Sequence, residues 1–311
     1  MRKIPLFRVV SGLLTFCILM TSGCDNGKTH DQDIDDLSVD EPDEIVLEDD
    51  VLSEPIKDDS IKTIFYDLAT PVELTDFVRF SKTAFDPDLL NPVENKNRYT
   101  INMKQALNLG VYGTDMVYCR LFSQKQESIN YLSAIRTVSQ EIGIPEDQIS
   151  ETLGKADKYM ENKDSLFSVI QEAYLRSNEY LKESERNSTA ALVYFGAWTE
   201  ALHIAINLYK KEDAAREKIA MHIAEQKFAL NNLLVLLRNT YDNPDVHQYI
   251  VLVKKLKKVY DGIDIFSENE QPEINTVKKV IIIDESKTKI TSAQIEEITK
   301  LIRRMRQDII S

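Results

Sequence analysis

The chain has 311 residues, of which 43% are hydrophobic and 29% are charged, and its formal net charge is −13. This composition is typical of a folded protein and excludes a chain that is disordered throughout. The acidity and the lack of a clustered basic face argue against nucleic-acid binding.

The negative charge is concentrated in one segment near the start of the chain. Residues 25–60 contain fifteen acidic residues against Lys28 and Lys57, a net charge of −13, whereas residues 1–23 have three basic residues and no acidic one. Residues 61–311 therefore carry a net charge of only −3. The chain thus consists of a basic and apolar start, an acidic segment and a nearly neutral remainder.

The first 24 residues have the pattern of a bacterial lipoprotein signal. A basic stretch precedes an apolar run from Val9 to Met20, which is shorter than the roughly 20 residues that a membrane-spanning helix needs. The Thr-Ser-Gly-Cys sequence that follows resembles a lipobox, although Thr21 stands where leucine is usual. The resemblance implies that residues 1–23 are a signal peptide removed by signal peptidase II and that Cys24 is lipidated. The alternative is an ordinary secretory signal followed by an unrelated cysteine.

Residues 24–60 are predicted to be the lipidated cysteine and a disordered acidic tether. This segment has few aromatic residues and dense like charge, so it cannot bury enough apolar surface to fold. As a random coil, about 36 residues reach roughly 30–36 Å. An acidic run after a lipidated cysteine resembles the surface-export signal of Bacteroidetes lipoproteins, whereas Asp25 directly after Cys24 resembles the inner-membrane retention signal of enteric bacteria. We expect an outer-membrane lipid anchor, with the periplasmic and the surface face both open.

Residues 61–311 are predicted to form a single all-α domain, a multi-helix bundle or short helical solenoid of about eight to nine helices. Thr70-Pro71-Val72-Glu73 has the residues of a capped helix start. A long helical stretch follows from Thr100 to Ile142 and could break near Ser123. The apolar period then predicts helices over residues 146–160, 164–184, 188–210, 213–240 and 244–261.

Residues 262–290 interrupt the helical pattern as one short irregular or extended segment. Val280–Ile283 could form a short strand, for which the sequence offers no evident partner. Thr291 and Gln294 then cap a last helix. Its apolar stripe contains Ile295, Ile298, Leu301, Ile302, Met305 and Ile309.

Several stretches of the folded part resemble a group of uncharacterised Bacteroidetes lipoproteins. These stretches are residues 105–115 (QALNLGVYGTD), 126–131, 141–144 and 290–294, together with Arg303-Arg304. The likeness implies an exported, lipid-anchored helical protein. It carries no known chemistry.

Glu200-x-x-His203 and His222-x-x-Glu225 are the most suggestive constellation for chemistry. Glu-x-x-His is the spacing with which di-iron bundles project two ligands from one helix. The apolar residues of both helices, however, predict that His203 and His222 lie away from the buried faces and that Phe228 lies on one. Only one true Glu-x-x-His is present, whereas a di-iron site needs two of them and two further carboxylates. We therefore predict solvated polar faces here, and no metal and no cofactor.

Asp115 interrupts an apolar stretch between Tyr112 and Tyr118. It could be a buried acid in a pocket with tyrosine hydroxyls, or an acid that is hydrogen-bonded to a neighbouring helix or to water, and the second interpretation is favoured. Cys119 follows in the same apolar stretch and is expected to be a buried structural thiol. With Cys24 lipidated, Cys119 has no partner for an intramolecular disulfide.

Ala106, Gly110, Gly113 and Val117 are spaced so that they share one stripe of a helix. Each glycine costs roughly 1 kcal/mol relative to alanine inside a helix. This cost favours a seam where another backbone approaches closely, and a helix break at Gly110 is the alternative. The seam predicts that Gly113→Leu destabilises the protein, whereas an exposed Gly113 predicts that it is stabilising.

The basic residues of the last two helices look like anion-binding clusters. Both groups lie near helix C-termini, where cations interact favourably with the helix dipole, so we predict solvated faces. These residues are Lys254, Lys255, Lys257, Lys258, Arg303, Arg304 and Arg306.

The sequence contains no nucleophile elbow, phosphate-binding glycine loop or cysteine cluster. We therefore expect a non-enzymatic, lipid-anchored binding or assembly module of the cell envelope, with no catalytic residue. Its expected partners are the membrane, through the lipid, and another envelope protein. The alternative function is a small-ligand or substrate-binding lipoprotein with a pocket between helices.

Overall fold

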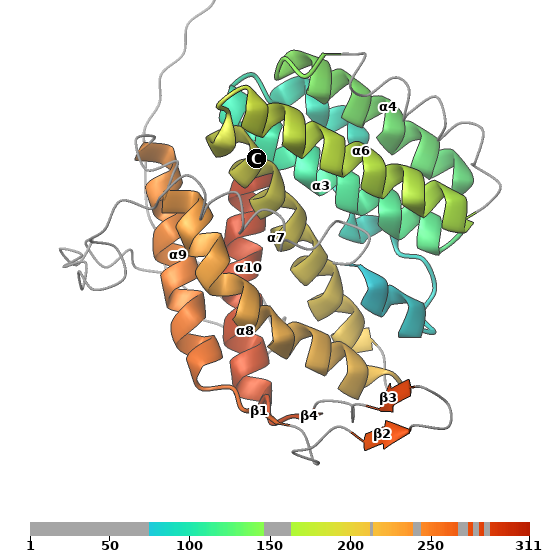
Figure 1. Ribbon diagram of the computed structural model, residues 1–311, viewed down its shortest axis with the longest axis vertical. Helices are drawn as coiled ribbons and strands as arrows, with labels where there is room; N and C mark the ends of the chain where they lie inside the picture. Colours follow the sequence, from blue (N-terminus) through green and yellow to red (C-terminus); the bar gives the residue numbers. More distant parts are fainter. Residues whose placement is uncertain are drawn as a thin grey trace, which may run out of the picture. The chain divides into compact units, whose positions relative to one another are not determined.

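Helices make up nearly all of the part of the chain that the computed structural model describes, which is residues 75–145, 163–211, 214–238, 244–266, 273–275, 280–282 and 287–311 (Figure 1). All of these residues belong to one compact unit. The signal peptide, the acidic tether, the helix start at Thr70 and the helix predicted over residues 146–160 lie outside them.

The described residues form the predicted all-α bundle. Short 3-10 helices come first, namely η1 (Asp76–Phe80), η2 (Pro87–Leu89) and η3 (Val93–Arg98). The α-helices are α3 (Asn102–Leu121), α4 (Lys125–Glu141), α6 (Lys163–Glu183), α7 (Asn187–Lys211), α8 (Arg216–Arg238), α9 (Pro244–Asp261) and α10 (Ser292–Ile310). The helices predicted within the described residues are confirmed to within a turn at each end.

The break between α3 and α4 falls at Ser123, as predicted. Ser123 has a φ of 62°, in the left-handed region, and the backbone N–H of Gln124 donates to the carbonyl of Cys119 at 2.8 Å. This six-to-one hydrogen bond is that of a Schellman motif, which commonly ends a helix. Glycine is the residue that most often occupies the left-handed position of this motif. Serine therefore holds the turn at a conformational cost.

The interruption between α9 and α10 contains two short antiparallel strand pairs. Strand β1 (Ile265–Phe266) pairs with β4 (Lys287–Thr288), and β2 (Glu273–Asn275) pairs with β3 (Val280–Ile282). The strand expected at Val280 thus has a partner, in the register Ile274↔Ile281. The capping box of Thr291 and Gln294 then starts α10.

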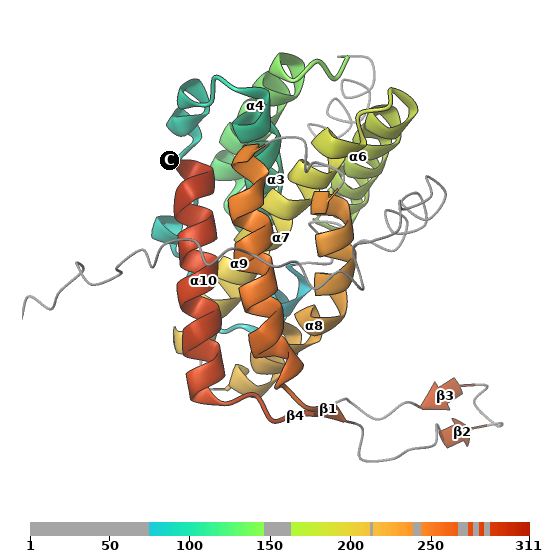
Figure 2. The ribbon, with the colours of Figure 1, turned by 90° about the vertical axis from the view of Figure 1, so that its left-hand side faces the viewer.

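Helix α7 is the core of the bundle and contacts α3, α6, α8 and α10. By length and composition it is the one described helix that could cross a membrane, but 89% of its most apolar window is buried inside the protein. Its Trp198 is fully buried and donates its indole N–H to Gln226 of α8 at 2.8 Å. The apolar composition of α7 is therefore explained by burial against other helices. Helices α9 and α10 also contact each other and lie side by side (Figure 2).

The backbones of α3 and α7 approach closely at two glycines. A Cβ atom on Gly110 would overlap the carbonyl oxygen of Val193 and lie 2.6 Å from the backbone nitrogen of Ala197. A Cβ atom on Gly196 would overlap the carbonyl oxygen of Leu107. Gly110 lies inside α3, so the alternative of a helix break there is wrong. Both glycines are needed because the opposing atoms belong to backbone and cannot rotate away.

Phe228 departs from the predicted amphipathic pattern of α8. Its side chain was expected in the core, but it is 68% exposed, whereas Gln226 is buried beside Trp198. His222 is half-buried, with its ring centroid 4.6 Å from that of Phe77 in η1. Hydrogen bonding to Trp198 turns Gln226 inward, and Phe228 consequently points outward.

Candidate functional site

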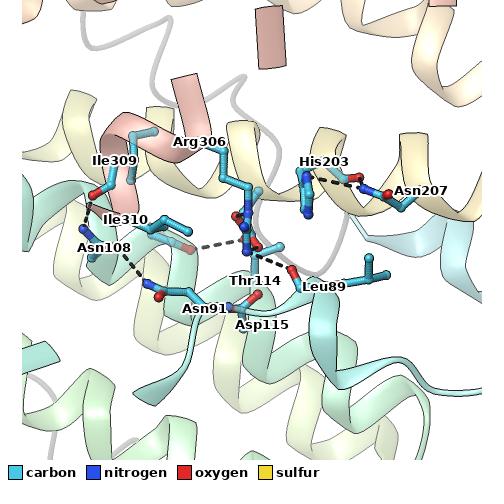
Figure 3. A network of polar contacts seen from close by, with 12 residues as sticks. Leu89, Asn91, Asn108, Thr114, Asp115, His203, Asn207, Arg306, Ile309 and Ile310 are labelled. Atoms are coloured by element: carbon cyan, nitrogen blue, oxygen red, sulfur yellow. Dashed lines mark hydrogen bonds and ion pairs between the residues drawn. The ribbon is translucent and has the colours of Figure 1, made fainter. Parts of the chain in front are cut away.

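The described residues contain a charged cluster that three helices bring together in the core. Asp115 comes from α3 and Arg306 from α10 (Figure 3), and Glu200 comes from α7. Asp115 and Glu200 have no exposed surface, and the side chain of Arg306 is only 11% exposed. Burying an ionised side chain costs free energy unless the side chain is paired. The contacts within this cluster therefore determine whether the cluster stabilises or destabilises the folded state.

Arg306 binds both carboxylate oxygens of Glu200 through two nitrogens of its guanidinium group. Its Nε donates to Glu200 Oε2 at 2.7 Å, and its Nη2 donates to Glu200 Oε1 at 2.8 Å. This two-point geometry is the strongest that an arginine can form with a carboxylate. Nη2 also donates to the carbonyl oxygen of Leu89, at the end of η2, at 2.8 Å. One side chain of α10 therefore connects that helix to α7 and to η2.

Asp115 lies next to this ion pair with only one of its oxygens satisfied. Its Oδ2 accepts a hydrogen bond from the backbone N–H of Asn91 at 3.1 Å, whereas Oδ1 is buried without a hydrogen-bond partner. Burial, followed by the negative charge of Glu200, raises the pKa of Asp115 well above its usual range. Arg306 forms its hydrogen bonds to a carboxyl group with Glu200, and the neutral, protonated form is favoured for Asp115.

Asparagine and tyrosine side chains surround the carboxyl groups. Asn91 Nδ2 donates to the Tyr99 hydroxyl at 2.9 Å and to Asn108 Oδ1 at 3.0 Å. The Tyr131 hydroxyl of α4 donates to the Asn91 carbonyl at 2.9 Å. Burial raises the pKa of Tyr131, so that it stays a neutral hydrogen-bond donor. This shell fixes the segment around Asn91, whose backbone N–H in turn binds Asp115.

The same shell holds the end of α10. Asn108 Nδ2 donates to the carbonyl of Ile309 at 2.8 Å (Figure 3). The Tyr99 hydroxyl donates to the carbonyl of Ile310 at 3.3 Å. Lys104 forms an ion pair with Asp308, 3.1 Å between Nζ and Oδ2. The last carbonyls of a helix have no partner within it, so these side chains act as its C-terminal cap.

His203 lies at the edge of the cluster, three residues after Glu200. The side chain is half-buried, and its Nδ1 lies 3.4 Å from Nδ2 of Asn207. Burial lowers the pKa of His203 to about 4, with Arg306 and Arg303 acting in the same direction. The attraction of Glu200 and a hydrogen bond to the Leu89 carbonyl oppose the shift. His203 is therefore neutral at neutral pH.

Two sequence-based predictions about these residues are wrong. Glu200 was expected on a solvated face, and it is fully buried, where it pairs with Arg306 of α10. Arg306 was expected on a solvated, dipole-matched face, and it points into the core to pair with Glu200. Arg303 and Arg304, by contrast, are exposed. The position of Arg306 in the helix could have indicated its burial. Arg306 follows the buried Ile302 by four residues and therefore borders the buried stripe of α10.

The other sequence candidates lie around this cluster without forming a second one. Gly110 lies at the α3–α7 contact, and Gly113 is half-buried. Cys119 is buried and has a raised pKa, because burial penalises the thiolate. Among the described residues no three histidine, cysteine or acidic side chains are placed to hold a metal ion.

The cluster can therefore hold a proton and hold three helices together. Its hydrogen bonds join its own side chains or reach backbone groups, Asp115 Oδ1 has no hydrogen-bond partner, and both carboxyl groups are enclosed. No protein-family model, curated protein or solved structure matches the chain.

Proposed function

We propose that this protein is a lipid-anchored module of the cell envelope that binds or assembles with another envelope protein. The observation that carries the proposal is the start of the chain, where an apolar run is followed by small residues and Cys24. A lipid on Cys24 would hold the protein at a membrane, and residues 25–60 would separate the helical domain from it. We propose the outer membrane as the site of anchoring.

Two features of the helical domain support a binding role. The charged groups of the described cluster are used within the core, where Arg306 and Glu200 connect helices. At the surface, α8 exposes Phe228, which is 68% accessible. A large aromatic residue exposed on a helix is the type of residue that anchors protein–protein interfaces.

The anchor is tested by replacing the lipidated cysteine. Cys24→Ala should abolish labelling with radioactive palmitate and release the protein from the membrane fraction. Cys119→Ala is the matched control, because Cys119 is buried in α3 and should leave labelling unchanged. A Cys24→Ala protein that still takes up label and sediments with membranes would contradict the proposal.

The binding role is tested by cross-linking in intact envelopes. The wild-type protein should yield a defined adduct with a second envelope protein, and both Cys24→Ala and Phe228→Ser should weaken it. Lys218→Ser, a change at another exposed position of α8, is the control that should not. Recovery of the protein alone with a co-purifying small molecule would instead favour the ligand-binding alternative.

A further inference from the structure

The outer edge of β3 pairs with no other strand in the part of the chain that the structure describes. β2 and β3 form a two-stranded antiparallel sheet, in which Glu273 lies opposite Ile282 and Asn275 lies opposite Val280. The other two described strands, β1 and β4, pair with each other. A sheet of two strands is only marginally stable by itself, and its unpaired backbone N–H and C=O groups are a template for a further strand.

The two outer edges of this sheet differ in their sequence. Pro272 directly precedes β2 and Glu273 begins it, and proline and charged residues are features with which proteins prevent pairing at a sheet edge. β3 belongs to the run Val280–Ile283, which consists of β-branched apolar residues that favour strands. The outer edge of β3 is therefore the edge that favours pairing with another strand.

The charged residues next to this run indicate which strand fits. Lys278 and Lys279 precede the run, and Asp284 and Glu285 follow it. In a symmetric antiparallel pair, one residue lies on the two-fold axis opposite its own counterpart, and residues equally far before and after it lie opposite each other. An axis at Ile282 places Lys279 of each copy opposite Glu285 of the other. Lys278 and Asp284 are then diagonal neighbours on the other face of the sheet.

These charges favour a second copy of the chain in antiparallel orientation. Opposite charges across two strands stabilise their pairing, whereas like charges destabilise it. Parallel pairing in the same register would place lysine opposite lysine and acid opposite acid. The four charged residues lie outside the described part of the chain, so their pairing follows from their order in the sequence and from the position of β3 between them.

We propose that two copies of this chain dimerise by pairing the outer edges of their β3 strands. The two hairpins then form one antiparallel sheet in the order β2–β3–β3–β2. Because the contact is symmetric and uses the unprotected edge of each copy, it closes at two copies. Pairing through β3 needs neither a lipid on Cys24 nor another envelope protein, so it goes beyond the proposed function.

Charge reversal on two differently tagged copies of the full chain tests the dimer. The acidic variant contains Lys278→Glu and Lys279→Glu, and the basic variant contains Asp284→Lys and Glu285→Lys. Both copies are expressed together and solubilised in mild detergent, one tag is captured, and the recovery of the other tag is measured. Two copies of the same variant should co-purify about tenfold less than two wild-type copies, because each cross-strand charge pair becomes repulsive.

An acidic copy and a basic copy should restore the wild-type recovery, because every cross-strand charge pair is then attractive again. This restoration also shows that both variants are folded. The matched control is Lys255→Glu with Lys258→Glu, which makes the same change of charge as the acidic variant at exposed positions of α9. The control should leave the recovery unchanged.

Three results would overturn the proposal. They are the absence of co-purification of two wild-type copies, an unchanged recovery of two copies of the same variant, and a mixture of acidic and basic copies that is recovered no better than either variant alone. Should a variant fail to fold, a chain with all four reversals, which has the net charge of the wild type, decides the question. Failure of this chain to pair with itself, or equally good pairing with the wild-type chain, would contradict the β3 dimer.

Discussion

Asp115 is a carboxyl group without exposed surface and with one oxygen that no donor reaches. Its raised pKa means that the folded state keeps a proton that the unfolded chain loses above its usual pKa of 3.8. The contribution of Asp115 to stability is therefore fully present below pH 3.8 and is lost as the pH rises through the raised value.

Asp115→Asn should consequently become more stable than the wild-type protein as the pH increases. Asparagine has nearly the same shape, accepts the hydrogen bond of the Asn91 N–H and cannot ionise. Urea unfolding at a series of pH values measures the difference. Asp88→Asn, at an exposed position of η2, is the control and should show no such trend. A difference that stays constant from pH 4 to pH 9 would contradict the burial argument.

Ser123 holds the α3–α4 turn with a φ of 62°. A residue with a Cβ atom is strained in this region by about 1 kcal/mol, and glycine is not. Ser123→Gly should therefore raise the free energy of unfolding by roughly 0.5–1 kcal/mol, measured by urea unfolding. Ser123→Ala keeps the Cβ atom and should bring no such gain. A destabilised Ser123→Gly protein would show that the serine side chain matters more than the backbone strain.

At the scale of elements, the α3–α7 contact depends on Gly110. Gly110→Ala would press a methyl group against the backbone of Val193 and Ala197, so it should cost about 1–3 kcal/mol or more. Gly113→Ala, at a half-buried position of the same helix, should cost less, because better helix propensity offsets part of any crowding. Thermal unfolding compares the two variants. If Gly110→Ala and Gly113→Ala lowered the melting temperature equally, the close approach of the α3 and α7 backbones would not be specific to Gly110.

The helices could be predicted because their sequence signals are local. The apolar stripe of α10 and its Thr291–Gln294 capping box lie within one stretch of chain, and so does the break at Ser123. The partner of β3 could not be predicted, because a three-residue strand has no pattern that selects β2. Phe228 was misplaced because its orientation follows from Gln226, whose partner Trp198 is on another helix.

At the scale of the whole molecule, the charged cluster was not predictable from periodicity. Glu200 shares one face of α7 with His203 and Asn207, which are half-buried, so its neighbours in the sequence indicated a solvated face. The partner of Glu200 is 106 residues away in the sequence, in the last helix. Asp115 was recognised as an unusual acid within an apolar stretch, but its neighbours come from three other elements.

The Arg306–Glu200 pair joins α10 to α7 inside the bundle. Arg306→Met would leave Glu200 buried without its cation, and Glu200→Gln would leave Arg306 without its anion. Each change should cost about 3–5 kcal/mol, because a single buried charge is worse than none. The double variant removes both charges and should cost clearly less than the sum.

A double-mutant cycle of this pair, measured by urea unfolding at pH 7, tests the claim most directly. The exposed pair Lys257–Asp261, with 2.8 Å between Nζ and Oδ1, is the matched control and should give a coupling energy below about 1 kcal/mol. We expect a coupling energy of at least about 2 kcal/mol between Arg306 and Glu200. Additive costs for Arg306→Met and Glu200→Gln, with a coupling no larger than that of the control pair, would contradict it.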